Sequence, residues 1–547
     1  MKYLFNLIVL LSIVCLSFTE KDNSLSDNEL LDFVSKTSEK NLEHHVAVLA
    51  HDSMKGRYPG TPEYQKAMNY VARQFKAMDL KPLGDKEGSS YFQPLTLRNV
   101  KTDESKSFML LNGKDPVKYG EDYYFISNAN QLENEFSGEV VFVGYGVDAP
   151  EHGYNDFENL DVKGKVMVMF TGAPESFPSS ERAYFNSTDN KLKTAVDKGA
   201  VGIFLVTNPS GENKFDRYYA YSKRKGTSNV VTPAGEAFGR SSYSKNLKAG
   251  GYMNQTFLAK LIGQPIEVIY EKYQSGEILQ PKDKKVLSGK SVGIYTEIKS
   301  ANVVGLMEGT SLKDEYIVHS AHLDHVGIGK PVNGDSIYNG AQDNAVGIAS
   351  MLEIARLYHE MKEKPKRSVI FLAVTAEEMG LLGSKYFAEN PTVPIEDIVA
   401  NVNTDMPVII APLLSIEPIG AEHSTLKNEV NRVAELLDLR VDDDHMPEEV
   451  RFVRSDQLSF VLKGIPALNI DYGLKVADPS IDLEKMIHDW DENHYHKPSD
   501  ELNESIDWAA GVKFTQLNFM LSYYVNMADK RPEWNEGDVF ARFKTKL

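Results

Sequence analysis

The apolar run at residues 368–374, SVIFLAV, is the feature that most constrains the fold. Its nearly continuous hydrophobicity is typical of a strand that is buried on both faces of a sheet. Similar runs lie at 316–321, 398–402 and 467–470, and helical patterns occupy 345–361 and 508–527. Strands that alternate with helices predict an α/β fold, with a mixed, mostly parallel sheet flanked by helices.

The middle of the chain has a different pattern. Short β-rich runs at 140–143, 166–170 and 201–206 are separated by glycine and proline, and residues 210–285 are polar and weakly patterned. We therefore predict a β-rich module at 111–289. It would be inserted into a discontinuous α/β domain formed by 20–110 and 290–547.

The first 18 residues indicate export. Lys2 precedes an apolar stretch at 3–18, and polar sequence begins at Thr19. This is the form of a secretory signal, and the run is short for a membrane-spanning helix. We predict a signal peptide at 1–19 and an exported protein, periplasmic or extracellular, with no integral membrane segment in its mature chain. An uncleaved membrane anchor and a lipid on Cys15 are the alternatives.

Cysteine content and charge exclude several classes of protein. The chain has 547 residues, one cysteine (Cys15) and a formal net charge of -18. One cysteine cannot form an intrachain disulfide framework or a metal site built from several thiolates. The acidic balance argues against nucleic acid or anionic membrane as the main partner. Any metal in the mature chain must therefore be held by His, Asp and Glu.

Polar side chains follow the predicted strands at the points where those strands end. They are His322, Asp324 and His325, then Asp343, then Glu377 and Glu378, then Asp405, and finally His494 and His496 before the last helix. Ligand sites in open α/β sheets lie at the carboxyl ends of the strands. We therefore expect these side chains to converge on one crevice.

The converging side chains are of the kinds that bind divalent metal ions. A mixed set of His, Asp and Glu suits two Zn²⁺ or related divalent ions that share a carboxylate. The neighbours Glu377 and Glu378 can divide the work, one as a ligand and the other as a general base. Asp324 is placed to orient His322. Each pair alone is typical of ordinary structural or surface residues, and only their order along successive strands points to a metal site.

The amino-acid sequences of these segments resemble the motifs of a known family. The chain reads SAHLDHVGIG at 320–329, then VTAEEMGLLGS at 374–384, NVNTDM at 401–406 and YHKPSD at 495–500. In these motifs the chain is similar to the co-catalytic zinc aminopeptidases. These are secreted bacterial and vacuolar enzymes that are related to glutamate carboxypeptidase. The middle block, with GEVVFVGYGVDAP at 138–150, resembles the protease-associated domain that many of them carry. The resemblance implies the zinc exopeptidase fold.

The resemblance also implies a role for individual residues. Asp343 bridges two metal ions, His322 and Asp405 complete one site, and Glu378 and His496 complete the other. Glu377 is the general base, Asp324 orients His322, and the peptide bond between Asp343 and Asn344 is cis. His496 is preferred to His494 because it lies in the YHKPSD segment. His494, His319 and His325 are expected to be structural or to lie behind the ligands.

We expect a secreted zinc-dependent aminopeptidase that hydrolyses N-terminal residues of peptides or proteins, through a metal-bridging hydroxide and the base Glu377. A carboxypeptidase or dipeptidase on the same scaffold, a glutaminyl cyclase-like transferase and a non-catalytic binding protein are the alternatives. Gln457 stands where relatives often have histidine, so the pocket near it is expected to differ. Side-chain preference, native metal and oligomeric state are not specified by the sequence.

Overall fold

The computed structural model describes residues 24–544, apart from 240, 242, 447–448 and 504. The predicted signal peptide, including Cys15, lies outside the described residues. No helix in the described part of the chain is long and apolar enough to span a membrane.

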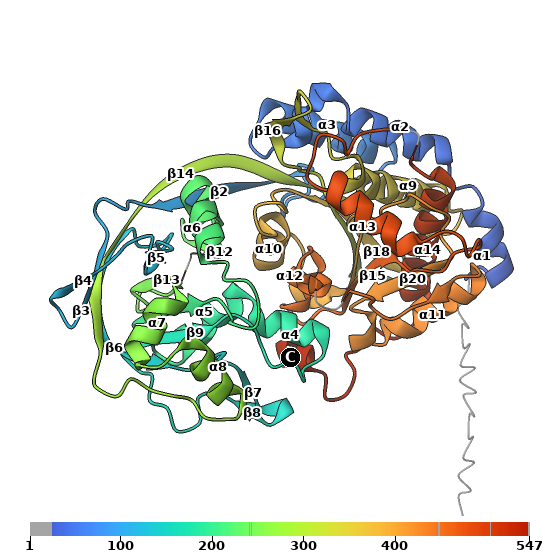
Figure 1. Cartoon of the computed structure of the whole chain (residues 1–547). Helices are drawn as coiled ribbons and strands as arrows, with labels where there is room; N and C mark the ends of the chain where they lie inside the picture. Colours follow the sequence, from blue (N-terminus) through green and yellow to red (C-terminus); the bar gives the residue numbers. More distant parts are fainter. Residues whose placement is uncertain (1–23, 240, 242, 447–448, 504, 545–547) are drawn as a thin grey trace, which may run out of the picture.

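The C-terminal half contains the predicted sheet (Figure 1). Its strands run in the order β14 (Val286–Met307), β18 (Arg367–Val374), β15 (Leu312–His322), β19 (Ile398–Asn403), β22 (Ala467–Tyr472) and β20 (Ser415–Ile419). The four central strands are parallel, and β14 and β20 pair antiparallel at either side. The predicted mixed, mostly parallel sheet is confirmed. Short strands β1 (Lys81–Pro82) and β21 (Arg440–Val441) extend its edges.

Strand β18 shows why the apolar run was informative. Val369, Phe371 and Ala373 belong to one buried core, and Ile370, Leu372 and Val374 belong to another. Because side chains alternate between the faces of a strand, both faces of β18 are covered. From Val369 to Val374 a strand buried on both faces is apolar at each position, as the sequence pattern indicates.

Helices cover the two faces of this sheet. The first core is formed with α1 (Asp27–Val34), α2 (Glu39–Leu49), α3 (Pro62–Ala77), α9 (Val346–Glu360), α11 (Leu426–Leu436) and α14 (Trp508–Met527). The second core includes α10 (Leu382–Glu389) and α12 (Gln457–Val461). Helix α3 begins at Pro62, because the Thr61 hydroxyl accepts a hydrogen bond from the Tyr64 amide and proline is favoured in the first turn.

The middle segment has a sheet of its own and is not purely β. Strands β6 (Glu133–Phe142), β9 (Val166–Phe170), β10 (Gly202–Val206) and β13 (Ala249–Met253) are parallel, and β5 (Tyr123–Phe125) pairs antiparallel with β13. Its helices are α4 (Ser179–Asn186), α5 (Thr188–Asp197), α6 (Phe215–Lys225), α7 (Gln255–Ile262) and α8 (Ile266–Gln274). Its remaining strands are β3 (Phe108–Leu111), β4 (Asp115–Val117), β7 (Asp148–Ala149), β8 (Tyr154–Asn155), β11 (Thr227–Val231) and β12 (Ala237–Gly239).

One long strand joins the two parts. In Figure 1, β14 arches from the middle segment to the C-terminal sheet. Its first residues pair with β3 and β6, and from Gly293 to Val303 it pairs with β2 (Phe92–Thr102). The predicted boundaries at 110/111 and 289/290 therefore fall inside strands β3 and β14 rather than in linkers. The division into domains stays a prediction.

Candidate metal centre

Five loops bring the predicted ligands together at the carboxyl ends of the parallel strands. His322 ends β15, Asp405 follows β19, and Glu377 and Glu378 follow β18. Asp343 lies in the turn Ala341–Ala345 (η3) that precedes α9. His496 lies between α13 (Leu483–Asn493) and α14. His322, Asp343, Glu377, Asp405 and His496 line a pocket of about 450 Å³.

The ligand atoms form two groups that share Asp343. In the first group, His322 Nε2 lies 3.0 Å from Asp405 Oδ1 and 3.2 Å from Asp343 Oδ1. In the second, His496 Nε2 lies 3.0 Å from Glu378 Oε2 and 3.2 Å from Asp343 Oδ2. The ligand atoms within each group lie within 4.8 Å of one another. Asp343 thus turns one oxygen toward each group, which is the arrangement expected of a bridging carboxylate.

Buried hydrogen bonds hold Asp343, the residue shared by both ligand groups. The Asp500 carboxylate accepts from the backbone amides of Gln342, at 2.8 Å, and Asp343, at 3.1 Å. The peptide bond between Asp343 and Asn344 is cis, as expected. The Asn344 side chain donates to the carbonyl of Thr404 at 2.8 Å and accepts from the amide of Met406 at 3.3 Å. The turn that carries Asp343 is therefore tied to the loop that carries Asp405.

Burial and charge both act on the titratable groups of the site. Burial raises the pKa of Glu377 well above its usual range, and the negative charges of Asp405 and Glu378 act in the same direction. Burial also opposes ionisation of Asp343, but the charge of His325 and the hydrogen bond from His322 hold its pKa well below the usual range. So many converging carboxylates need a compensating cation.

The donor set fits divalent zinc. Both groups consist of nitrogen and oxygen ligands from His, Asp and Glu, the kinds that zinc binds in catalytic sites. Glu378 Oε1, which is buried, has no hydrogen-bond partner among the described residues. A buried carboxylate oxygen without a partner is costly unless a cation supplies the missing contact. Two metal ions, one in each group, would satisfy these atoms.

Glu377 lies beside both groups and belongs to neither. Its side chain lines the pocket, and its backbone amide donates to Asp324 Oδ1 at 3.1 Å. Asp324 contacts His322 differently from our expectation. The Nδ1 atom of His322 lies 3.1 Å from the backbone carbonyl of Asp324, and not from its carboxylate. The tautomer of His322 is therefore set by a carbonyl, because the chain turns sharply after β15.

Of the three histidines that were expected to be structural, two lie outside the ligand groups and one lies within them. His494 Nδ1 lies 2.9 Å from the Ser499 carbonyl, so His494 stabilises its own loop. His319 is buried in the sheet and stacks on Phe371. His325, however, belongs to the second ligand group together with Asp343, Glu378 and His496. The only sequence signal for it was its place in the His-Leu-Asp-His segment, three residues after His322.

Gln457, which stands where relatives often have histidine, does not line the pocket. It is fully buried in α12, where its Nε2 donates to the Phe452 carbonyl and its Oε1 accepts from Asn403. An amide can donate and accept at once, and both capacities are used inside the core. Its effect on the pocket is therefore indirect, through the strand that leads to Asp405.

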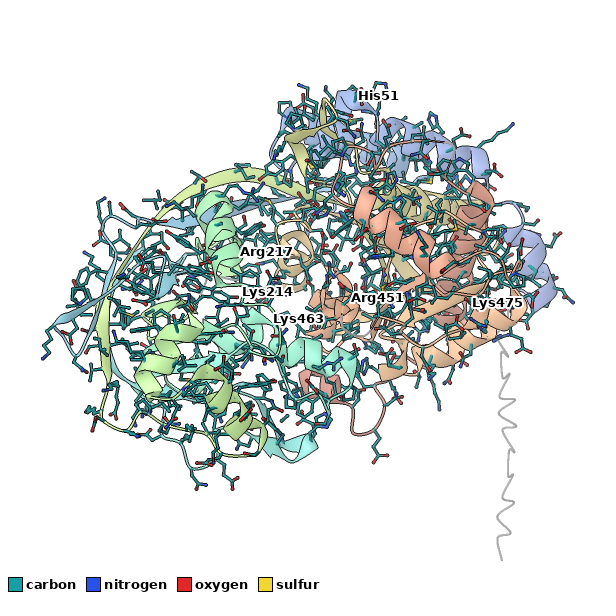
Figure 2. The ribbon with its side chains drawn as sticks, viewed as in Figure 1. His51, Lys214, Arg217, Arg451, Lys463 and Lys475 are labelled. Atoms are coloured by element: carbon teal, nitrogen blue, oxygen red, sulfur yellow. The ribbon has the colours of Figure 1, made fainter. Side chains whose placement is uncertain are left out.

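The pocket wall carries two arginines that are already paired with carboxylates. Arg451, labelled in Figure 2, contacts Glu417 at 2.5 Å, Asp471 at 2.9 Å and also Asp444. Arg454 contacts Glu449 at 2.7 Å. Arg451 thus has more negative than positive charge around it, and the wall next to the ligand groups is acidic on balance.

Comparisons with known proteins find similarity over the part of the chain that holds the candidate metal centre. Residues 302–522 match the model of peptidase family M28. The glutamate carboxypeptidase 2 homolog of Caenorhabditis elegans is 24% identical over 298 residues, which are 46% of this chain and 35% of that protein. The aminopeptidase NAALADL1 of Rattus norvegicus is 32% identical over 125 residues, which are 21% of this chain and 15% of that protein. These matches span about a third or less of the curated relatives' length.

Among solved structures, an aminopeptidase from Aneurinibacillus sp. strain AM-1 is similar with a TM-score of 0.48 and 19% identity, covering 93% of this chain and 97% of that one. A likeness at this level carries no argument about activity. All residues of the two ligand groups lie within the matched segment. Residues 302–522, which hold the candidate metal centre, are thus the part of this chain that is similar to peptidase family M28.

Proposed function

We propose that this protein is an exported, zinc-dependent aminopeptidase that removes N-terminal residues from peptides or proteins. The observation that carries the proposal is the pair of ligand groups that share Asp343, with Glu377 beside them and outside both. His322, Asp343 and Asp405 would hold one Zn²⁺, and Asp343, Glu378 and His496 the other. Two bound zinc ions supply Lewis acidity and lower the pKa of a bound water.

Glu377 would move the proton in this reaction. Its carboxylate would take a proton from the attacking water and deliver it to the nitrogen of the leaving amine. The contact between its amide and the Asp324 carboxylate fixes the start of the loop that carries it.

The charge of the pocket wall supports cleavage from the amino end. A carboxypeptidase needs a cation that is available to the substrate carboxylate, and Arg451 and Arg454 both contact carboxylates already. An acidic wall suits the ammonium group of a free amino terminus instead. A carboxypeptidase is the second candidate, because these two arginines do line the pocket.

Three versions of one peptide separate the two candidates. An aminopeptidase cleaves the free peptide and its C-terminal amide but not the N-acetylated form. A carboxypeptidase cleaves the acetylated form but not the amide. Cleavage of the acetylated peptide would overturn our proposal.

The role of Glu377 is tested by Glu377→Gln. We expect turnover to fall at least about 10²-fold, in line with loss of a general base. The zinc content measured by atomic absorption should stay at two ions per chain, because Glu377 is in neither ligand group. Glu363→Gln, at an exposed position outside the pocket and both ligand groups, is the matched control and should retain activity. Full activity of Glu377→Gln would exclude this residue as the base.

Export rests on the sequence of residues 1–19. We expect the protein to be recovered outside the cytoplasm with an amino terminus near residue 20, and N-terminal sequencing of the native protein checks this. An intact Met1 on the exported protein would favour the membrane-anchor alternative.

A further inference from the structure

His325 has the surroundings of a metal ligand. It follows β15 by three residues, and its side chain is 0% exposed. Its Nδ1 atom lies 2.8 Å from Glu378 Oε1 and 3.6 Å from Asp343 Oδ2. Neither ring nitrogen has a hydrogen-bond partner among the described residues, and Glu378 Oε1 has none either. The contact with Glu378 is an ion pair, and it leaves the Nε2 atom of His325 without a partner among the described residues.

His325 differs from other buried histidines because its unsatisfied ring lies against carboxylates of a ligand group. Buried imidazoles usually donate one N–H and accept at the other nitrogen, and a missing partner costs about 1–3 kcal/mol for each group. His325 and Glu378 both face the same point with unsatisfied atoms. A cation at that point would accept both lone pairs.

The backbone makes room for this ring. Gly340 has a φ of +62°, and a Cβ atom on it would lie 2.6 Å from Cγ of His325 and 2.2 Å from the carbonyl oxygen of Asp343. Only glycine lets the His325 ring lie so close to the turn that carries Asp343. The fold thus places His325 against the bridging aspartate, on the side of His496, whose ring centroid is 5.5 Å away.

We propose that His325 is a ligand of the ion that Asp343, Glu378 and His496 hold. This inference rests on the proposed metal centre and adds a ligand to it. One ion would then have four protein ligands, and the other, held by His322, Asp343 and Asp405, would have three. Zinc sites with four protein ligands are closed, whereas three ligands leave a position open. An ion held by His322, Asp343 and Asp405 alone would therefore exchange more readily and leave a position open to substrate.

Zinc titration of the metal-free protein tests this assignment without using activity. With a competing chromophoric chelator, we expect the wild-type protein to bind two ions with unequal affinity. His325→Ala should weaken the tighter of the two by more than about 100-fold, beyond the 10–100-fold range of residues that only support a ligand. Unchanged affinity for both ions would overturn the proposal.

His319 offers the matched control. It is 1% exposed, both of its ring nitrogens lack hydrogen-bond partners in the described part of the chain, and its ring stacks on Phe371 at a centroid distance of 5.8 Å. It is therefore a buried, unsatisfied histidine outside both ligand groups. His319→Ala should cost stability but leave both zinc affinities unchanged.

A cysteine at position 325 distinguishes a ligand from a supporting residue. A metal-bound thiol is deprotonated, and a thiolate bound to Co²⁺ gives a charge-transfer absorption band. The cobalt form of His325→Cys should show this band, while wild type and His319→Cys should not. A cobalt spectrum of His325→Cys without the band would overturn the proposal, even if affinity falls. These readouts do not depend on peptidase activity, so failure of the proposed function would be seen separately in the peptide assay.

Discussion

At the scale of single residues, Arg57 is the buried support of the metal centre. It is 0% exposed, and its guanidinium donates to the carbonyls of Leu49, Leu323, Asn339 and Gly340 at 2.6–2.9 Å. Leu323 follows His322, and Gly340 begins the turn of Asp343. The planar guanidinium of Arg57 thus joins two of the ligand loops through donors in a fixed arrangement. The ammonium group of a lysine has fewer donors and could not make all of these contacts.

We expect Arg57→Lys to lower the free energy of unfolding by at least about 3 kcal/mol, because it leaves buried carbonyls without donors. Urea denaturation measures the loss, and zinc titration of the same variant should show weaker binding. Arg73→Lys, at an exposed position on α3, is the control and should change neither quantity. Normal stability of Arg57→Lys would show that the carbonyls find other donors.

The residues of the site were only partly predictable from the sequence. His322, Asp343, Glu378, Asp405 and His496 stand at strand ends or in one loop, where topology alone brings them together. The position of His325 depends on how the chain turns after β15 and on the space left by Gly340. The spacing of residues along the sequence predicts neither the turn nor this space. For the same reason Asp324 approaches His322 with its carbonyl and not with its carboxylate.

At the scale of elements, the sequence predicts best those helices and strands that are buried along their whole length. Helix α14 covers the predicted 508–527, and β18 covers the apolar run, because both are buried along their length. The length of β14 was not predicted. Where it pairs with β2, residues such as Ile294 and Tyr295 are exposed, so this ribbon has no regular alternation of apolar and polar residues.

A short C-terminal element gives a pH-dependent prediction. His423, in the turn η5 (Ala421–His423), contacts Asp538 at 2.8 Å, just before η8 (Val539–Phe543). Burial opposes its protonation, but the contacts with Asp538 and Glu422 raise its pKa to about 9. Because the folded pKa is above the unfolded value of about 6.5, the stabilisation is complete below pH 6.5 and is lost as the pH rises through 9.

We therefore expect His423→Gln to lower the free energy of unfolding by roughly 2–3 kcal/mol near pH 6, and by much less near pH 10. Denaturation of both proteins at the two pH values gives the difference. The exposed His488→Gln is the control and should show no such dependence. A difference that is constant with pH would mean that the His423 charge does not stabilise the C-terminal segment.

At the scale of the whole molecule, the two sheets are coupled by shared structure. Strand β14 belongs to both, and one buried core contains Val166 and Phe204 from the middle segment as well as Val318 and Ile370 from the C-terminal sheet. The last described element, η8 (Val539–Phe543), also packs on α4, where Tyr184 contacts Phe540 and Phe543. Contacts of this kind favour cooperative unfolding of the two parts.

Metal removal tests this coupling. Without zinc, the carboxylates around Asp343 repel one another, and with free zinc at 100 times its dissociation constant the folded state gains about 2.7 kcal/mol. We expect calorimetry of the chelated protein to show one transition, and added zinc to move that whole transition to higher temperature. Asp343→Asn, which lacks the shared bridging carboxylate, is the control and should respond little to zinc. Two transitions, of which only one moves with zinc, would instead support the predicted division into an inserted module at 111–289 and a separate metal-binding domain.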